Sequence, residues 1–192
     1  MKKLLISAVA LFASAMSYAQ DWSFDKSHSS VKFSVTHMMV SETAGQFRKF
    51  DGTIKSTAAD FQNALIDFNI DINSIDTDVD QRDAHLKSAD FFDAAKYPNI
   101  TFKSKSFTKV DGKKYKLTGD LTMQGATKTV TLNVVYNGTV KDPYGFNRAG
   151  FKISGTINRY DFGLKYNAAL EAGGTVISEE VEIVCAVEFT KK

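Results

Sequence analysis

The side chains best suited to chemistry lie close together in the stretch QRDAHLKSADFFDAAKYP. Arg82, Asp83 and His85 are of the types used in general acid–base catalysis, and histidine is also a common metal ligand. Two large apolar residues, Phe91 and Phe92, follow directly. The stretch could therefore be an active site, a metal site or a piece of scaffold.

Catalysis would need a nucleophile that the sequence does not supply. On a helix, Arg82 and His85 share a face, whereas Asp83 points elsewhere and can pair with Lys87. None of the serines stands in the strand-turn-helix elbow of a hydrolase. The single cysteine, Cys185, is expected to be buried. We therefore expect a protein that is not an enzyme and keep an enzyme as an alternative.

A metal site would have to use the three histidines of the chain, His28, His37 and His85. Three histidines can bind zinc, but no HxH or HxxxH spacing brings two of them together locally. We expect no metal site.

The first 19 residues have the features of a secretory signal peptide. Lys2 and Lys3 precede an apolar run that ends at Ala15, and the small residues Ser17 and Ala19 precede the expected cleavage site. The run is too short to cross a bilayer, which takes roughly 20 apolar residues. We expect a periplasmic or secreted protein without a transmembrane segment.

The rest of the chain, residues 20–192, is predicted to form one domain with no net charge. The two lysines of the leader are its only charged residues, which leaves 22 Lys and Arg against 22 Asp and Glu. Such a balance lacks the basic excess that nucleic-acid binding requires. Because Cys185 is the only cysteine, no internal disulfide can form. Stability must come from an ordinary apolar core.

Alternation of apolar and polar residues predicts eight strands, because successive side chains of a strand face opposite sides. The clearest strand spans residues 63–72, with Ala64, Ile66, Phe68, Ile70 and Ile72 on one face. The segment 45–55 keeps its alternation only with a bulge near Arg48 and Lys49. The other predicted strands span residues 30–39, 99–107, 114–123, 129–140, 149–158 and 181–189.

One apolar face on every strand favours a closed antiparallel barrel. Closure hides that face and removes exposed edges, whereas a parallel sheet would be apolar on both faces. A two-sheet sandwich is the alternative. The one break in the pattern, around residues 80–95, is rich in Ala, Asp, Lys and Gln and predicts a short helical insertion. The predicted fold is therefore an all-β, eight-stranded antiparallel barrel with a helical insertion.

The barrel interior is predicted to hold a guest. Gly119, Gly138 and Gly155 fall on inward positions of three consecutive strands, which leaves room inside. The alternative interpretation is that these glycines mark bulges or sharply coiled strands. The expected lining is apolar, so the expected guest is a long apolar chain. This lining consists of Val31, Phe33, Phe68, Ile70, Leu117, Leu121, Leu132, Tyr136, Phe151 and Ile153.

An ordered set of short motifs resembles the YceI-like family over nearly the whole of residues 20–192. The motifs are His28-Ser29, Gly45 with Phe47, Ser74-Ile75, Arg82-Asp83-Ala84-His85-Leu86, Phe91-Phe92-Asp93, Tyr97-Pro98-Asn99-Ile100-Thr101-Phe102, Gly119-Asp120-Leu121-Thr122, Thr127-Lys128 and Asn158-Arg159. The sequence departs from the family at Asp78, where Gly is common, at Gln124, where His is common, and at Thr129, where Pro is common. Of these, Gln124 could alter the choice of head group.

The resemblance implies a lipocalin-like barrel with an internal tunnel that holds a polyisoprenoid or similar long-chain lipid, such as an isoprenoid quinone, in the periplasm. It also implies a homodimer. No other cofactor is expected. Three functions stay open: a carrier or reservoir for such a lipid, an enzyme acting on it, and a ligand-free barrel that supports protein contacts.

For the polar stretch we expect scaffold. Arg82 and Asp83 would tie the helical segment to strand ends, and Phe91 and Phe92 would close one end of the tunnel. Contact of Arg82, His85 or His37 with a lipid head group is the alternative, so these residues join the lining in the predicted binding site.

Overall fold

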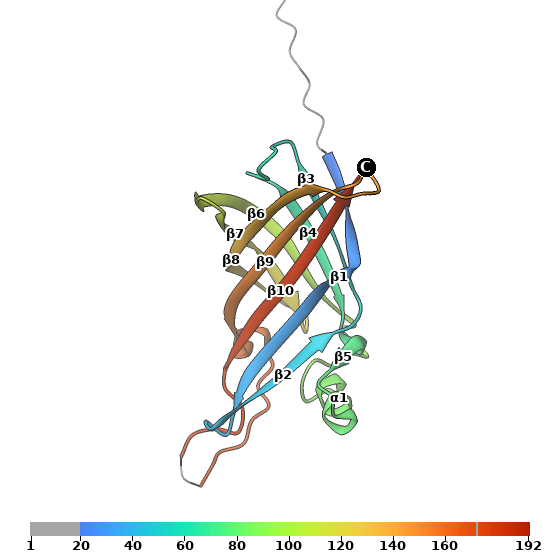
Figure 1. Cartoon of the computed structure of the whole chain (residues 1–192). Helices are drawn as coiled ribbons and strands as arrows, with labels where there is room; N and C mark the ends of the chain where they lie inside the picture. Colours follow the sequence, from blue (N-terminus) through green and yellow to red (C-terminus); the bar gives the residue numbers. More distant parts are fainter. Residues whose placement is uncertain (1–19, 172) are drawn as a thin grey trace, which may run out of the picture.

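The computed structural model describes residues 20–171 and 173–192, so the predicted signal peptide lies outside the described residues. Its elements are mostly strands, with one α-helix, α1, and two 3₁₀ turns, η1 and η2 (Figure 1). Their bounds are β1 Gln20–His37, β2 Ser41–Phe47, β3 Phe50–Ser56, β4 Leu65–Asp71, η1 Ile72–Ser74, β5 Ile75–Asp76, α1 Asp80–Lys87, β6 Asn99–Asp111, β7 Lys114–Met123, β8 Ala126–Lys141, β9 Asn147–Asn158, η2 Arg159–Phe162 and β10 Glu180–Lys191.

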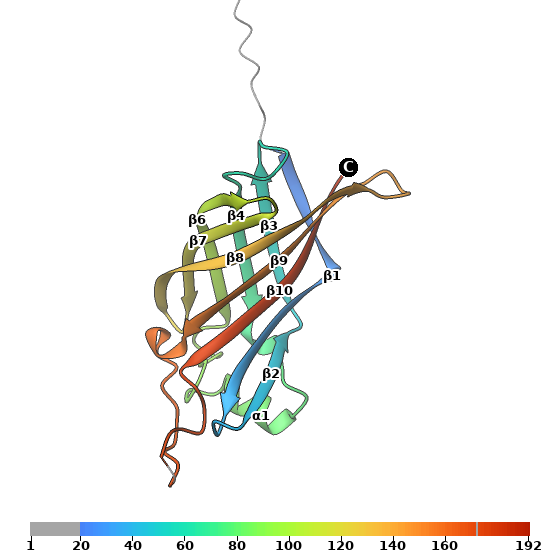
Figure 2. The same cartoon turned by 60° about the vertical axis from the view of Figure 1, so that its left-hand side comes forward.

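Eight strands close into a barrel. The order runs β10-β9-β8-β7-β6-β4-β3-β1, and β1 returns to pair with β10. All these neighbours are antiparallel. Figures 1 and 2 show the ring from two sides, with β1 and β10 crossing the front together. The prediction of a closed, eight-stranded antiparallel barrel is confirmed, and the sandwich alternative is wrong.

Strand β1 is longer than predicted and changes partner along its length. Its first residues, Gln20–Ser23, pair with β3, and Val31–His37 pair with β2. A register shift between Asp25 and Ser30 bends the strand between these two halves. Strands β2 and β5 therefore extend the wall beyond the ring at the end where α1 lies (Figure 2).

The predicted bulge near Arg48 and Lys49 is instead a complete break between β2 and β3. The amide of Arg48 donates to the carbonyl of Ser74 at 3.0 Å, and the amide of Lys49 donates to Ser74 Oγ at 2.9 Å. The η1 turn thus satisfies the backbone groups that a continuous ladder would have paired.

The predicted helical insertion is present as α1 and the turns that follow it. Asp83 is buried and accepts from the amide of Thr77 at 2.9 Å and from Thr77 Oγ1 at 2.6 Å. This bond replaces the predicted pairing of Asp83 with Lys87, because the Thr77 donors lie inside the fold, where an unpaired polar group would cost free energy. Asp78, at a position where the family often has Gly, adopts a left-handed φ of 62°.

The three inward glycines do not create the room inside the barrel. The Phe102 ring packs onto Gly119, and the Leu132 side chain packs onto Gly155, so neighbouring side chains already fill both spaces. Gly138 has a φ of 125° and lies at a register shift in β8. The alternative interpretation, a bulge, holds for Gly138, whereas Gly119 and Gly155 allow a neighbouring side chain to pack close to the backbone.

We predict that Gly119→Ala destabilises the protein by about 1–3 kcal/mol, because the new Cβ would collide with the carbonyl oxygen of Lys103 as well as with the Phe102 ring. Gly150→Ala is the matched control, since its Cβ would meet only Asn137, at an ordinary 3.6 Å. Urea unfolding of both variants measures the difference. Equal midpoints for the two variants would contradict this account of Gly119.

Candidate functional site

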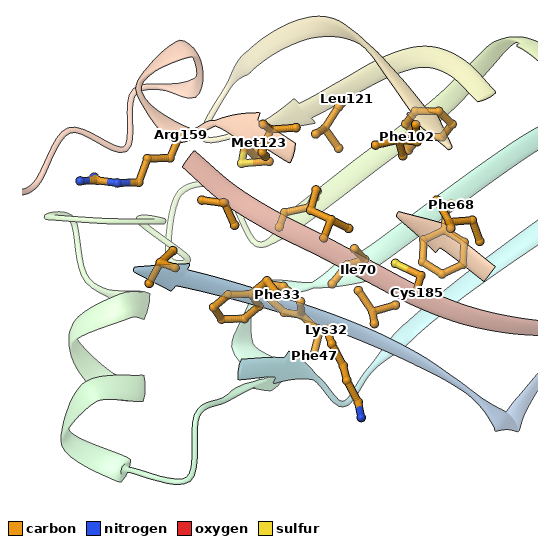
Figure 3. Close-up of a pocket in the computed structure, with 18 of the residues that line it drawn as sticks. Lys32, Phe33, Phe47, Phe68, Ile70, Phe102, Leu121, Met123, Arg159 and Cys185 are labelled. Carbon is orange, nitrogen blue, oxygen red and sulfur yellow. The ribbon is translucent and has the colours of Figure 1, made fainter. Parts of the chain in front are cut away.

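The barrel encloses an apolar cavity of about 470 Å³. Side chains from β1, β4, β6, β7, β9 and β10 converge on it (Figure 3). In that view Phe68, Phe102 and Leu121 point inward, while the Lys32 ammonium extends away from the apolar groups. The cavity is therefore shaped to hold apolar matter.

Of the fifteen residues predicted for the site, the structure places fourteen on the cavity wall. Tyr136 is the exception: its ring stacks on Phe151, at 5.2 Å between centroids, and its hydroxyl pairs with Thr139 Oγ1 at 2.6 Å. Whether any of these residues contacts a ligand stays a prediction. The fourteen are Val31, Phe33, His37, Phe68, Ile70, Arg82, His85, Phe91, Phe92, Leu117, Leu121, Leu132, Phe151 and Ile153.

One end of the cavity is closed by a floor of aromatic rings. Phe107, Phe151 and Phe189 line the cavity there, and each is at most 4% exposed. Phe151 contacts Phe107 and Phe189 edge-on, at centroid distances of 6.2 and 6.1 Å. These three residues are called the floor below.

A second layer of rings backs the floor. Tyr115 stacks on Phe107 at 4.8 Å, and Phe61 meets Phe151 edge-on at 5.1 Å. Tyr136 belongs to the same layer, and Trp22 covers Phe61 at 5.2 Å. Because Phe61 and Tyr115 are at most 2% exposed, this end of the barrel is sealed.

Sequence reasoning missed the floor. It expected Phe91 and Phe92 to close one end of the tunnel, and these two residues line the other end of the cavity, beside α1. Phe61 stands in the loop between β3 and β4, where no strand alternation marks it as inward-facing. Its left-handed φ of 63° is uncommon for a residue without a short polar side chain. No sequence signal reveals that geometry.

The opposite end is the mouth, formed by α1, the turns after it and the segment around Tyr166. The His85 ring meets the rings of Phe91 and Tyr166 edge-on, at 5.0 and 4.8 Å. Its Nε2 lies 3.2 Å from an Asp90 carboxylate oxygen. Phe92 packs edge-on against Phe47 at 6.2 Å. Aromatic rings therefore line this end of the cavity.

Arg82 is held by backbone and side-chain groups of the chain itself. Its Nε donates to Thr77 Oγ1 at 2.7 Å, and its Nη2 donates to the carbonyl of Thr77 at 2.6 Å. Together with the Asp83 bonds to Thr77, these contacts tie α1 to the segment after β5, as the scaffold interpretation requires. Gln124, one of the family departures, donates from Nε2 to the carbonyl of Phe91 at 2.7 Å and supports the same region.

Arg159 is a buried cation at the mouth end, only 3% exposed (Figure 3). Its guanidinium donates to four backbone carbonyls: Ser178 at 2.8 Å, Leu164 at 2.5 Å, Tyr166 at 2.9 Å and Ile177 at 3.3 Å. Burial lowers the pKa of Arg159 below its usual value. The residue thus fixes the two ends of the loop that borders the mouth. The sequence analysis named Arg159 only as part of a family motif and assigned it no role.

Apart from Lys32, whose ammonium extends away from the apolar groups, and the Cys185 thiol, the polar groups on the cavity wall gather at the mouth. Thr43, Thr77, Arg82, His85 and Arg159 all lie there, whereas the floor is wholly apolar. His37 ends β1 at the same end, and its ring makes no hydrogen bond to any described residue. A guest with one polar end would therefore place that end at the mouth.

The histidines do not converge on a metal site in the described part of the chain. His28 does lie near Asp25 and Glu188, three groups that could hold a metal ion. However, Arg148 Nη1 already donates to Asp25 at 2.9 Å and to Glu188 at 2.5 Å. A cation thus occupies this position, so the cluster is an ion-pair network that joins β1, β9 and β10.

Cys185 lines the cavity, and burial raises the pKa of its thiol to about 12. At pH 8 only about one thiol in ten thousand would then be ionised, compared with about one in ten for a cysteine whose pKa is 9.0. We predict that iodoacetamide alkylates Cys185 in the folded protein about 1,000 times more slowly than in protein unfolded by 6 M urea. Similar rates in both solvents, followed by mass spectrometry, would show that the thiol is not buried in apolar surroundings.

We predict that Arg159→Leu lowers the free energy of unfolding by about 3 kcal/mol, because it leaves buried carbonyls without donors. The free energy of unfolding of Arg159→Lys, which restores part of the hydrogen bonding, should lie between those of Arg159→Leu and the wild type. Arg48→Leu removes an exposed ion pair with Asp76 and should cost no more than about 1 kcal/mol. Urea unfolding measures the stability of the three variants. An Arg159→Leu midpoint equal to that of Arg48→Leu would show that Arg159 does not stabilise the loop at the mouth.

Three comparisons place the chain among known proteins. The sequence model of the YceI-like domain matches residues 22–189. A UPF0312 protein of Staphylococcus aureus (strain bovine RF122 / ET3-1) is 39% identical over 171 residues, 88% of this chain and 97% of that protein.

Solved structures have the same fold. Burkholderia cenocepacia BcnA matches with a TM-score of 0.75 and 26% identity, over 86% of this chain and 98% of its own. The Campylobacter jejuni YCEI protein matches with a TM-score of 0.71 and 31% identity, over 82% and 90%. A polyisoprenoid binding domain from Saccharophagus degradans, implicated in plant cell wall breakdown, has a TM-score of 0.62 and 18% identity, over 89% and 98%, and shares the fold.

Proposed function

Because this chain belongs to the YceI-like family, we propose that it is an exported lipid-binding protein that holds one long apolar chain, such as an isoprenoid, inside its barrel. It would serve as a carrier or reservoir. One observation carries the proposal: an apolar cavity of about 470 Å³, closed by aromatic rings at the floor, with its polar groups gathered at the mouth.

The energetics favour an apolar guest. Each CH₂ group that leaves water for such a cavity contributes up to about 0.8 kcal/mol. One five-carbon prenyl unit therefore contributes up to about 4 kcal/mol, and a few units outweigh the cost of association. Affinity does not depend on a charged head group, which fits a wall whose two arginines, Arg82 and Arg159, are already bonded to the chain.

The head group would lie at the mouth. His85 presents a half-exposed ring there, next to Tyr166, whereas the guanidinium of Arg82 is committed to Thr77. We infer that His85 is better placed than Arg82 to contact a head group. The polyisoprenoid binding domain from Saccharophagus degradans agrees with the chemical class, although it shares only the fold with this chain.

Binding is favoured over catalysis on chemical grounds. A thiol with a pKa near 12 is a poor nucleophile at neutral pH. The serine beside the His85–Asp90 pair, Ser88, donates its hydroxyl to the backbone carbonyl of His85 at 2.7 Å, so this hydroxyl is not directed at the imidazole that would have to activate it. An enzyme acting on the lipid is the second candidate, and turnover of the extracted lipid that is lost on His85 or His37 substitution would favour it.

Export rests on the leader-like sequence of residues 1–19, which points to the periplasm or the exterior. Among the described helices, none has the length and apolarity needed to cross a bilayer. The homodimer implied by the family resemblance stays a prediction.

The direct test is the mass of whatever copurifies with the mature protein. Native mass spectrometry followed by organic extraction should find one long-chain lipid per barrel. Ile153→Trp, which fills the cavity from β9, should reduce the bound lipid several-fold, while Lys152→Trp on the outer face of the same strand should not. Protein that carries no lipid and takes none from a mixed lipid extract would refute the proposed function.

A further inference from the structure

The turn that joins β1 to β2 exposes three consecutive apolar side chains. Met38, Met39 and Val40 are 44%, 68% and 86% exposed, and these three residues are called the tip below. The amide of Val40 donates to the carbonyl of His37 at 3.1 Å, which closes the turn. Met38 and Met39 both adopt left-handed φ angles, of 50° and 62°, where Asn and Gly are usual. Backbone strain at exposed apolar residues is a sign of a functional surface.

The tip borders the mouth. His37, directly before it, lines the cavity. The amide of Met38 donates to the carbonyl of Val176, another cavity residue, at 2.8 Å, and the Met39 side chain lies against Gly174. The tip is therefore joined to the loop between η2 and β10, and both project beyond the ring of strands at the end where α1 lies (Figures 1 and 2). A surface that binds the tip would also face the opening of the cavity.

The charges around the tip do not favour a strongly charged partner. The tip has no charged residue, and the segment 163–178 has only Lys165 and Glu171, whose charges cancel. Asp78 and Asp80 are exposed at the start of α1. These residues supply no positive excess for an anionic surface, so an uncharged or zwitterionic surface fits the tip best.

The size of the tip favours a lipid surface over a protein. At these exposures the tip offers roughly 400 Å², if a fully exposed residue of this size has about 200 Å². A stable protein complex or dimer buries about 800 Å² on each partner. The tip is a narrow turn with about half that area, whereas shallow insertion into the interface of a bilayer needs no complementary surface. A bilayer is therefore the partner that the tip fits.

We propose that the tip docks the protein on a bilayer of uncharged or zwitterionic phospholipid, with Met39 and Val40 in the headgroup layer and the mouth facing the lipid. The inference goes beyond the proposed function, because docking requires no guest in the cavity. Where a guest is bound, this orientation lets it pass between bilayer and cavity without crossing water, since His37 and Val176 join the tip to the cavity wall.

The opposite end of the barrel supplies a matched control position. Tyr144, in the turn between β8 and β9, is 84% exposed. This turn projects at the other end of the barrel, near the carboxyl terminus (Figure 1). Lys141 and Asp142 precede Tyr144 closely, so charged groups flank it. Docking through the tip leaves Tyr144 in water.

The first experiment places a tryptophan at each end of the barrel. Mature Val40→Trp and Tyr144→Trp are mixed with vesicles of brominated phosphatidylcholine, which quench tryptophan only within the bilayer. Trp22, the single native tryptophan, contributes equally to both variants. We expect the vesicles to remove at least about a third of the fluorescence of Val40→Trp and to leave that of Tyr144→Trp unchanged, because tryptophan favours the membrane interface where the protein reaches it.

The second experiment removes the apolar groups of the tip. The double variant Met39→Asp, Val40→Asp is sedimented with sucrose-loaded vesicles of dioleoylphosphatidylcholine. Its vesicle partition coefficient should fall at least about tenfold below that of the wild type, because inserting charged side chains is costly. Aspartate tolerates the left-handed φ at position 39 better than methionine, so the turn is kept. Tyr144→Asp is the control and should match the wild type.

Three results would overturn docking by the tip. The first is quenching of neither tryptophan variant, or of Tyr144→Trp alone. The second is an unchanged partition coefficient in the double variant, and the third is a partition coefficient that rises more than about fivefold when about one lipid in five is anionic.

A second copy of the chain is the other occupant to be tested. A dimer in size-exclusion chromatography that the double variant loses, without vesicle binding by the wild type, would show that the tip joins two copies instead. In each case the lipid content of the purified protein still tests the proposed function by itself.

Discussion

The pairing of β1 with β10 is the contact on which the rest of the structure depends. Eight paired positions, from Ser23 opposite Thr190 to Ser34 opposite Glu182, join the first and last strands of the ring. Without that ladder two long edges would lie open and the apolar inner face would meet water. With it, the inner faces of eight strands must share one interior, and an eight-stranded ring is just wide enough either to fill with side chains or to hold a small guest.

This chain uses both solutions, at different levels of the barrel. Around Phe61, Tyr115 and Phe151 the interior is filled with rings, while nearer the mouth the side chains leave a continuous space. The polar groups follow the same division. Arg159 and the Arg82–Thr77–Asp83 group hold the loops around the opening, and none of their buried polar atoms lacks a hydrogen-bond partner. The apolar wall would bind the guest, and the polar groups at the mouth would set its orientation.

The barrel could be predicted from the sequence because it follows from a local rule, the alternation of faces along each strand. Ile66, Phe68 and Ile70 obey this rule plainly. The same rule placed most of the cavity wall correctly. It could not find what depends on distant neighbours. The first residues of β1 carry too many polar side chains to be recognised as a strand. Phe61 faces inward from a strained loop, and Arg159 is satisfied by carbonyls of the loop that follows it. The prediction that the inward glycines leave room inside was wrong for a related reason: Phe102 and Leu132, on neighbouring strands, fill the spaces beside Gly119 and Gly155.

The central claim is that an apolar chain lies along the barrel axis with its free end against the aromatic floor and its polar end at the mouth. Nuclear Overhauser contacts between bound farnesol and selectively labelled aromatic rings test this directly. The account predicts contacts from the terminal methyl groups of farnesol to Phe151 and Phe107, and from its hydroxyl-bearing carbon to Tyr166 or Phe91. Terminal methyl contacts to Tyr166 with none to Phe151, or no contact to any cavity ring, would contradict it.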